Sequence, residues 1–388
     1  MKKVLAVIAI SILVILGGLV SVYAVSDNNQ LNLPHNVYSA TVPFSPLEQQ
    51  FQSHEQSYIV HVNDLTGILP VAYSSTITIS ALNGITKDGN LLLIVGGSTD
   101  YASVWNPLIG TYNLETGQFS DLTSQFISEL SASNWYLTSA AWDGHSFLIV
   151  GVRYIGSVTV PAMALYNPHS SRFSDLSSSI PAADSNWMLS GIAWTGKGST
   201  FMIVGFEPSS SSTGVQPVMA SYTGHRFVDL SQLIPSNYYS TYFLGITKVA
   251  DNYLITGWQG VNLYPNSGGI LLLYTPGRDT FTDLSSLIPS NVFWLGGSAV
   301  AMPRNEVLVV GVTYSDSPAA GILNLSTRTY TDLTPSSSPN PFPSAYYYLN
   351  GAIWLSGNTF MVVGGSQPTA ANSAGGAGIM GEVTINQD

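Results

Sequence analysis

The sequence predicts an all-β protein, a six-bladed β-propeller with four strands in each blade. Two short markers each recur six times at a spacing near 54 residues, and the segments between them divide into four short strands with tight turns. No segment shows a 3.6-residue period of apolar residues over ten or more positions, so we expect almost no helix. A repeat of this length is typical of propellers and solenoids, and four strands per repeat favour the propeller.

The first marker is an apolar run that ends in glycine. It occurs at spacings of 55, 54, 52, 54 and 53 residues and ends at Gly96, Gly151, Gly205, Gly257, Gly311 and Gly364. The second marker is an Asp-Leu-Ser/Thr step, with intervals of 57, 54, 54, 54 and 49 residues between Asp64, Asp121, Asp175, Asp229, Asp283 and Asp332. Six equivalent aspartates indicate a scaffold role, in which each accepts backbone or hydroxyl hydrogen bonds where the fourth strand ends.

One repeat illustrates the four strands. A strand of small residues, Leu137–Trp142, precedes a tight Asp-Gly turn and the glycine-terminated strand Phe147–Gly151. After a longer loop, a third strand ends at Tyr166, and a polar turn leads into the fourth strand, Phe173–Leu176. This order predicts antiparallel strands joined by hairpins.

The two ends of the repeat region complement each other. The region begins with a lone fourth strand, residues 58–66, and finishes with a third strand, residues 378–386. We therefore expect Tyr58–Val62 to complete the last blade, which closes the ring and covers an exposed edge. The propeller spans residues 57–388, and residues 25–56 form an N-terminal extension with one short helix at the Ser45-Pro46-Leu47-Glu48 capping box.

The first 24 residues are typical of an export signal. Two lysines precede an uncharged apolar run from Val4 to about Val25, and Val22-Tyr23-Ala24 suits signal peptidase cleavage. The run is also long enough to span a bilayer, so an uncleaved N-terminal membrane anchor is the alternative. Under both interpretations the remaining chain is extracellular or at the cell surface.

The composition excludes several classes of protein. Charged residues are only 9% of the chain, and 11 Lys+Arg against 22 Asp+Glu give a net charge of −11, which disfavours nucleic-acid binding. The absence of cysteine excludes disulfides and thiolate chemistry. So few charges limit self-repulsion when carboxylates are protonated, which favours an acidic medium such as that of a thermoacidophilic archaeon. An ordinary secreted protein of polar composition is the alternative.

The repeat resembles the kelch repeat, which also builds the central domain of galactose oxidase. The resemblance covers residues 57–388 and is carried by Val95-Gly96-Gly97 and by the tyrosine–turn–aromatic segment Tyr112–Phe119. It implies a propeller fold. The Gly pair is complete only at Gly96-Gly97 and Gly364-Gly365, whereas Val, Phe or Trp follows the glycine in the other copies. The copper site of the oxidase uses a Cys-modified tyrosine, so its chemistry is not expected here.

Loop lengths predict which face carries the function. The connections between the second and third strands, and those between blades, are long, and long loops on a rigid scaffold are where function usually lies. This loop-side face carries our candidates for ligand binding: Tyr101, Trp105, Arg153, Tyr154, Trp258 and Tyr314. The repeated Asn-aromatic step of the inter-blade loops (Trp135, Trp187, Trp294) either adds to this face or wedges between blades.

Three classes of function remain open. The first is a binding module that recognises a glycan or a surface protein through aromatic contacts, with Arg153 orienting a ligand or forming a structural ion pair. The second is a secreted carbohydrate hydrolase or lyase using Asp100, Glu207 or Asp316. The third is a structural component of an envelope or surface filament. The six histidines show no metal-binding spacing, so neither a metal nor a cofactor is expected.

Overall fold

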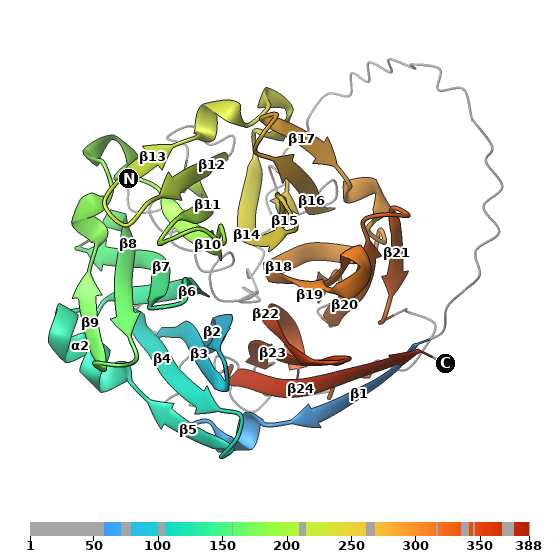
Figure 1. Ribbon diagram of the computed structural model, residues 1–388, viewed down its shortest axis with the longest axis horizontal. Helices are drawn as coiled ribbons and strands as arrows, with labels where there is room; N and C mark the ends of the chain where they lie inside the picture. Colours follow the sequence, from blue (N-terminus) through green and yellow to red (C-terminus); the bar gives the residue numbers. More distant parts are fainter. Residues whose placement is uncertain are drawn as a thin grey trace, which may run out of the picture.

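The computed structural model describes residues 58–70, 79–99, 105–156, 158–208, 215–260, 268–315, 317–334, 341–343, 346–366 and 376–387. Within these ranges the chain forms six four-stranded antiparallel sheets around a common axis, which confirms the six-bladed β-propeller (Figure 1). The expected export signal and the short helix expected in residues 25–56 lie outside the described residues.

Blades 1 to 5 each use four consecutive strands, ordered from the axis outward. Blade 1 contains β2 (Ile79–Asp88), β3 (Leu91–Thr99), β4 (Trp105–Asn113) and β5 (Gln118–Asp121). Blade 2 contains β6 (Trp135–Trp142), β7 (Phe147–Ile155), β8 (Val158–Asn167) and β9 (Arg172–Asp175). Blade 3 contains β10 (Met188–Trp194), β11 (Phe201–Pro208), β12 (Val215–Tyr222) and β13 (Phe227–Asp229). Blade 4 contains β14 (Thr241–Val249), β15 (Asn252–Gln259), β16 (Gly268–Thr275) and β17 (Thr280–Asp283). Blade 5 contains β18 (Val292–Met302), β19 (Glu306–Thr313), β20 (Pro318–Asn324) and β21 (Thr329–Asp332).

Blade 6 joins the two ends of the described chain. It contains β22 (Tyr346–Ser356), β23 (Thr359–Ser366) and β24 (Gly378–Gln387), and its outer strand is β1 (Tyr58–Asp64). The β1–β24 pair is antiparallel and runs in register from Tyr58 opposite Gln387 to Asp64 opposite Gly381. The predicted closure of the ring is therefore confirmed, and the two strands lie side by side in Figure 1.

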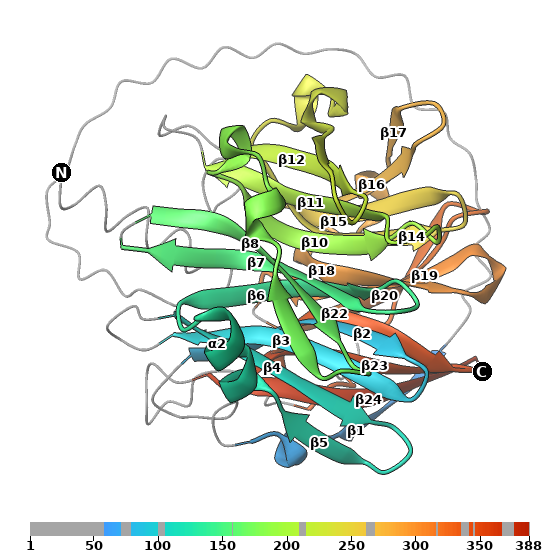
Figure 2. The same ribbon diagram turned by 60° about the vertical axis from the view of Figure 1, so that its left-hand side comes forward.

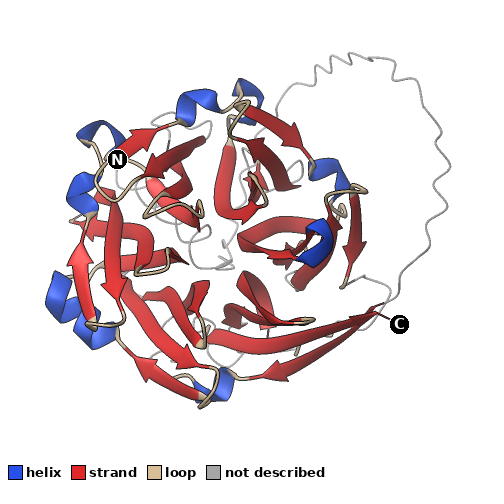
Figure 3. Ribbon diagram, in the orientation of Figure 1, coloured by secondary structure: helices blue, strands red, loops and turns tan. Residues whose placement is uncertain are grey.

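Short helical turns lie outside the sheets, mostly at the rim of the ring (Figure 3). The 3-10 turns are η1 (Thr66–Ile68), η3 (Ser177–Ser179), η4 (Ala182–Asp184), η5 (Ser231–Leu233), η6 (Ser236–Tyr238), η7 (Ser285–Leu287) and η8 (Pro303–Asn305). One α-helix, α2 (Thr123–Leu130), connects blades 1 and 2. The sequence did not predict α2. The helix has only eight residues and buries only Phe126, so it contains no repeated apolar position from which a helical period could be recognised.

The recurring glycine allows the two inner strands of a blade to approach closely. In each blade the pairing between these strands contains a bulge, for example between Leu189 and Gly191 in blade 3. A Cβ atom on Gly205 would lie 2.0 Å from the carbonyl oxygen of Met188, and the same clash occurs at Gly96, Gly151, Gly257 and Gly364. Only glycine leaves room for the bulged backbone.

The Asp-Leu-Ser/Thr step attaches the outer strand to the third strand, as the repeat predicted. In all six copies the aspartate Oδ1 accepts a hydrogen bond of 2.7–2.9 Å from the N–H of the Ser or Thr two residues later. The hydroxyl of that Ser or Thr accepts a bond of 3.0–3.2 Å from the third strand. The six aspartates therefore have the scaffold role that their copy number predicted.

Polar side chains join neighbouring blades close to the axis. Asn83 donates to the Leu137 carbonyl oxygen at 2.8 Å, and Thr138 donates to the Leu189 carbonyl oxygen at 2.8 Å. At the same level, a Cβ on Gly297 of blade 5 would lie 3.3–3.6 Å from three carbonyl oxygens, those of Leu244, Asn350 and Asn83, which belong to blades 4, 6 and 1. The backbone of β18 therefore reaches the axis at this level.

Candidate functional site

The loop-side face is the end of the propeller from which the longer connections emerge. The helix α2 and the tip of the β7–β8 hairpin lie at this end (Figure 2). Three sequence candidates on this face (Asp100, Tyr101 and Asp316) lie outside the described residues. The described candidates are Trp105, Arg153, Tyr154, Glu207, Trp258 and Tyr314.

All four aromatic candidates in the described ranges belong to one hydrophobic cluster, which we call the aromatic cap. The cap draws on all six blades and is buried at Ala81, Trp105, Tyr136, Val152, Met188, Phe206, Leu244, Trp258, Phe293, Val312 and Tyr348. The half-buried side chains of Tyr154, Val215, Tyr242 and Tyr314 pack against it. The candidates that sequence analysis placed on separate blades are therefore brought together.

Trp105 and Trp258 are buried within the cap, and each is only 5% exposed. Trp105 stacks on Tyr154 with ring centroids 5.1 Å apart and an interplanar angle of 6°. Trp258 stacks on Tyr242 at 4.5 Å and 23°, and Tyr242 meets Phe206 edge-on at 4.9 Å. The two tryptophans form the interior of the cap, and the half-buried tyrosines form its margin.

The position after the recurring glycine explains how the cap is filled. Val152, Phe206, Trp258 and Val312 occupy this position in blades 2 to 5, and all four belong to the cap. In blades 1 and 6 the position is Gly97 and Gly365, where a Cβ would lie 2.1 Å from the ring of Tyr136 and 2.3 Å from the hydroxyl of Tyr348. The complete Gly pairs therefore make room for a tyrosine ring from an innermost strand.

Unpartnered polar atoms occur in the aromatic cap, at Tyr154 and Trp258. They also occur at Arg153 and Thr241, which are chain neighbours of cap residues and whose side chains leave the strand on the opposite face. Among the described residues, five buried side-chain N or O atoms have no hydrogen-bond partner, and four of them belong to the loop-side ends of strands: Arg153 Nε, Tyr154 Oη, Thr241 Oγ1 and Trp258 Nε1. The fifth, Thr195 Oγ1, follows β10 at the opposite end. Thr159 lies opposite Tyr154 in the β7–β8 pair, but the two side chains do not reach hydrogen-bonding geometry. Buried polar groups normally have partners, so this concentration is unusual.

Three tyrosines of the cap and its margin carry raised pKa values. Burial raises the pKa of Tyr242 to about 12, and it also raises the pKa of Tyr154 and of Tyr136. A phenol with a raised pKa keeps its proton at acidic and neutral pH. These three side chains are therefore uncharged donors.

The two charged candidates that the structure describes, Arg153 and Glu207, each interact with residues that were not candidates. Arg153 Nη1 lies 3.7 Å from Asp175 Oδ2, so Arg153 forms an ion pair within its own blade. Glu207 at the end of β11 acts on Asp184 electrostatically, as does Asp229. Asp100 and Asp316, the other carboxylates proposed for an acid/base site, lie outside the described residues, so that prediction stays a prediction.

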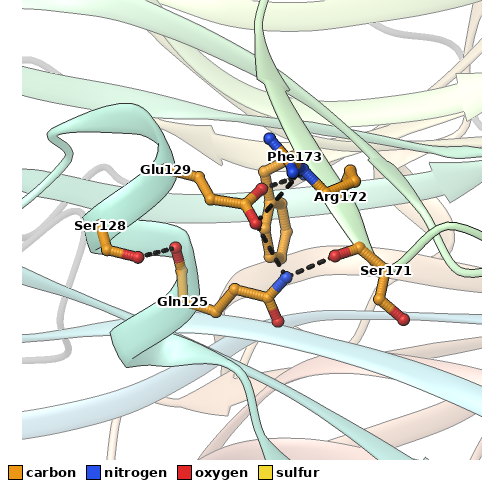
Figure 4. Close-up of polar contacts among 6 residues, drawn as sticks. All are labelled: Gln125, Ser128, Glu129, Ser171, Arg172 and Phe173. Carbon is orange, nitrogen blue, oxygen red and sulfur yellow. Dashed lines mark hydrogen bonds and ion pairs between the residues drawn. The ribbon is translucent and has the colours of Figure 1, made fainter.

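Glu129, another charged residue of the inter-blade loops, holds α2 against blade 2 (Figure 4). Its Oε2 accepts a hydrogen bond of 2.7 Å from the Phe173 N–H, and its Oε1 lies 3.5 Å from Arg172 Nε. Gln125 donates to Glu129 at 3.1 Å and also to the Ser171 carbonyl oxygen. These bonds, chiefly that from Phe173, lower the pKa of Glu129. Glu129 therefore has a structural role.

The aromatic residue of the Asn-aromatic step packs between two blades in the copies whose side chain the structure describes. Trp135 is 3% exposed and packs edge-on against Phe126 of α2 at 5.5 Å, in a cluster shared by blades 1 and 2. Trp187 is 4% exposed and belongs to the cluster shared by blades 2 and 3. The Trp294 side chain lies outside the described parts. Trp135 and Trp187 are therefore packing residues.

Sequence analysis missed several members of the cap and its margin. Phe206, Tyr242 and Thr241 were not among the candidates, and each lies at the loop-side end of a strand. The signal that could have found Phe206 is the position after the recurring glycine, which faces the cap in every blade. Thr241 offered no signal, since its significance depends on the missing partner of its hydroxyl.

Two searches for other kinds of site found nothing in the described ranges. No helix there is long and apolar enough to cross a membrane. No group of three or more His, Asp or Glu side chains there has a geometry suited to a metal ion.

Comparisons with known proteins support the fold and do not identify a function. No family model matches the chain, and no curated protein matches it in sequence. A crystal structure of a protein of unknown function from Dyadobacter fermentans DSM 18053 is similar, with a TM-score of 0.55 and 10% sequence identity. The match covers 81% of this chain and 97% of that chain. At this identity the likeness concerns the fold alone.

Proposed function

We propose that the protein is an extracellular or cell-surface binding module whose loop-side face recognises a glycan. The observation that carries this proposal is the presence in the aromatic cap of two unpartnered donors, Tyr154 Oη and Trp258 Nε1. Stacked rings with neutral N–H and O–H donors suit the apolar faces and hydroxyl groups of sugars. A surface protein is the other ligand that such a face suits.

A secreted carbohydrate hydrolase or lyase is the alternative. A glycosidase needs two carboxyl groups at a defined separation on either side of the scissile bond. Of its candidates, Asp100 and Asp316 lie outside the described residues, and Glu207 acts electrostatically on Asp184. No observation specifically favours a structural filament.

A glycan array probed with the full-length protein tests the proposal. We expect a hit whose affinity falls at least tenfold in Trp258→Phe and Tyr154→Phe, since each variant removes one polar donor and keeps an aromatic ring. Trp142→Phe is the matched control, because Trp142 ends β6 at the opposite end of the blade. Equal loss in Trp142→Phe, or unchanged affinity in both cap variants, would contradict the choice of face. A protein ligand with the same dependence would replace the glycan.

We infer that the repeat is of the kelch type and that the chain is exported. The Gly pairs that accommodate Tyr136 and Tyr348, together with the cross-strand pair of Tyr112 and Phe119, support the kelch assignment. A profile built from the six repeats should then detect kelch repeats, and its failure to do so would argue for an independent origin. Sequencing of the N-terminus of the native protein tests export: a start after Ala24 supports cleavage, whereas an intact N-terminus in a soluble cytoplasmic fraction contradicts export.

An acidic medium remains our proposal for the environment. The described residues contain two ion pairs, and hydrogen bonds between backbone groups, which do not titrate in acid, join many of the elements. We expect the unfolding temperature at about pH 3 to stay close to that at about pH 7. Complete unfolding at about pH 3 would contradict this environment.

A further inference from the structure

Asn324 ends β20 and begins the turn that leads to β21. It is the one asparagine of the chain that has Ser or Thr two residues later with no proline between them, in the sequence Asn324-Leu325-Ser326. This pattern is the acceptor sequence for N-linked glycosylation of exported proteins. Because such a sequence needs an accessible amide, the geometry of the turn bears directly on its use.

The carbonyl oxygen of the Asn324 side chain shapes the turn. Asn324 Oδ1 accepts hydrogen bonds of 3.0 Å from the N–H groups of Ser326 and Thr327. The Leu325 N–H donates to the Asn305 carbonyl oxygen at 2.9 Å, which ties the turn to the first hairpin of blade 5. The side chain therefore has a fixed orientation that depends on its oxygen atom.

The nitrogen atom of the same amide is held much more weakly. Asn324 Nδ2 donates to Glu306 Oε1 at 3.5 Å, which is the long limit of a hydrogen bond. Asn324 is partly exposed, and Ser326 is exposed, as are the next three residues of the turn. The atom that receives a glycan is thus the atom on which the folded turn depends least.

Two other blades build the same turn without the acceptor sequence. Asn113 ends β4 and Asn167 ends β8, and the Oδ1 atom of each accepts two backbone bonds of 2.9–3.2 Å. The residues that follow them are Leu-Glu and Pro-His. The asparagine at this position therefore serves the turn in blades 1, 2 and 5, and only blade 5 adds the serine.

Asn324 lies at the end of blade 5 that is remote from the aromatic cap. Pro318, the first residue of β20, pairs with Val312 of the cap. Asn324 is six residues further along the strand, which corresponds to about 20 Å. A glycan on Asn324 therefore leaves the loop-side face open.

We propose that Asn324 carries an N-linked glycan, transferred from an oligosaccharide that is linked to a lipid phosphate or diphosphate. This inference rests on the proposed export of the chain and not on recognition of a glycan by the loop-side face. Asn324 Nδ2 forms the new bond to the anomeric carbon of the first sugar and loses one proton to solvent. The bond from that carbon to the phosphate oxygen breaks, and the lipid phosphate leaves with the electron pair. Oδ1 remains a carbonyl oxygen and keeps its two hydrogen bonds.

Mass spectrometry of the full-length protein from its natural host tests the proposal. Trypsin cleavage after Arg304 and Arg328 releases residues 305–328 as one peptide. We expect this peptide to carry the added mass of a glycan. The mass should be lost in Ser326→Ala, which keeps the backbone N–H of the turn, and restored in Ser326→Thr. An unmodified peptide from protein recovered outside the cell or in the membrane fraction would overturn the proposal and leave export intact. Recovery of the protein only in the cytoplasm would overturn both.

The equivalent turns of blades 1 and 2 provide matched controls. Glu115→Ser completes an acceptor sequence at Asn113, so we expect a second modified site in this variant. His169→Ser places a serine two residues after Asn167, but Pro168 lies between them, so Asn167 should stay unmodified. A modified Asn167, or an Asn113 that stays unmodified in Glu115→Ser, would overturn the proposal that the acceptor sequence in this turn directs the transfer.

Discussion

At the scale of single residues, the recurring glycine sets how closely the inner strands can approach. The bulge in the innermost strand directs a carbonyl oxygen at the next strand, and the space left is too small for a methyl group. Gly257 is one example, with its hypothetical Cβ only 2.0 Å from the Tyr242 carbonyl oxygen. Because the contact is with backbone, it cannot be relieved by a change of side-chain rotamer.

We expect Gly257→Ala to destabilise the protein by about 3 kcal/mol or to prevent folding, because the strand pair would have to separate. Gly277→Ala in the same blade is the control, since no atom lies within 4 Å of a Cβ there. Urea unfolding of the two variants measures the difference. Equal stabilities would show that the bulge adapts to a side chain.

Residue identity alone did not reveal which aromatic rings are buried. Trp105 and Trp258 lie at the ends of strands beside long loops, a position that predicts exposure. Whether such a ring is buried depends on the residues that face it from other blades. A glycine there leaves space, and a tyrosine there fills it.

At the scale of elements, the outer strands are short and depend on a hydroxyl for their attachment. In blade 4, the Leu271 N–H donates to Ser285 Oγ at 3.0 Å, and the Leu284 N–H donates to the Leu271 carbonyl oxygen at 2.8 Å. The hydroxyl therefore satisfies a backbone donor beyond the point where β17 has ended.

Ser285→Ala should cost about 1–3 kcal/mol, because it leaves the Leu271 N–H without a partner. Ser286→Ala provides a neighbouring control, as Ser286 is exposed. Thermal unfolding of both variants measures the effect. Similar unfolding temperatures would mean that water replaces the hydroxyl without loss.

Third strands carry proline where no outer strand covers them. Pro107, Pro161, Pro217 and Pro318 each pair with the residue that follows the recurring glycine. The outer strands pair only with the far ends of the third strands, so the loop-side ends are open edges. Proline offers no N–H to a foreign strand, so these positions protect the edges from aggregation.

The attachment of helix α2 to blade 2 should depend on pH through Glu129. Hydrogen bonds to Glu129 lower its pKa, so its contribution is present above the ordinary pKa of a glutamate and is lost as the pH falls through the lowered value. We expect Glu129→Gln to reduce stability at about pH 7 and to have little effect at about pH 2. Hydrogen exchange of the Phe173 amide provides the local measurement, and an unchanged rate near neutrality would contradict this role.

At the scale of the whole molecule, closure of the ring depends on strand β1. Deletion of residues 57–66 should expose the outer edge of β24 and cause aggregation or unfolding, because the seven paired residues of β1 are lost. A synthetic peptide of residues 57–66, added during refolding, should restore a soluble ring, whereas a scrambled peptide should not. Light scattering and circular dichroism measure both effects. A soluble, folded deletion variant would show that closure is dispensable.

The global fold was predictable because it is repeated. Six copies of each marker determine the number of blades, and the unpaired ends of the repeat region determine how the ring closes. Features that occur once carry no such signal. The helix α2 and the three-residue bulge around Gly297 break the repeat, and both depend on contacts with a neighbouring blade rather than on local pattern.

Gly297 lies where several blades meet. Backbone atoms from blades 1, 4, 5 and 6 lie around it, and a Cβ there would be 3.3–3.6 Å from three carbonyl oxygens. A larger side chain at this one position would therefore press on three neighbouring blades at once.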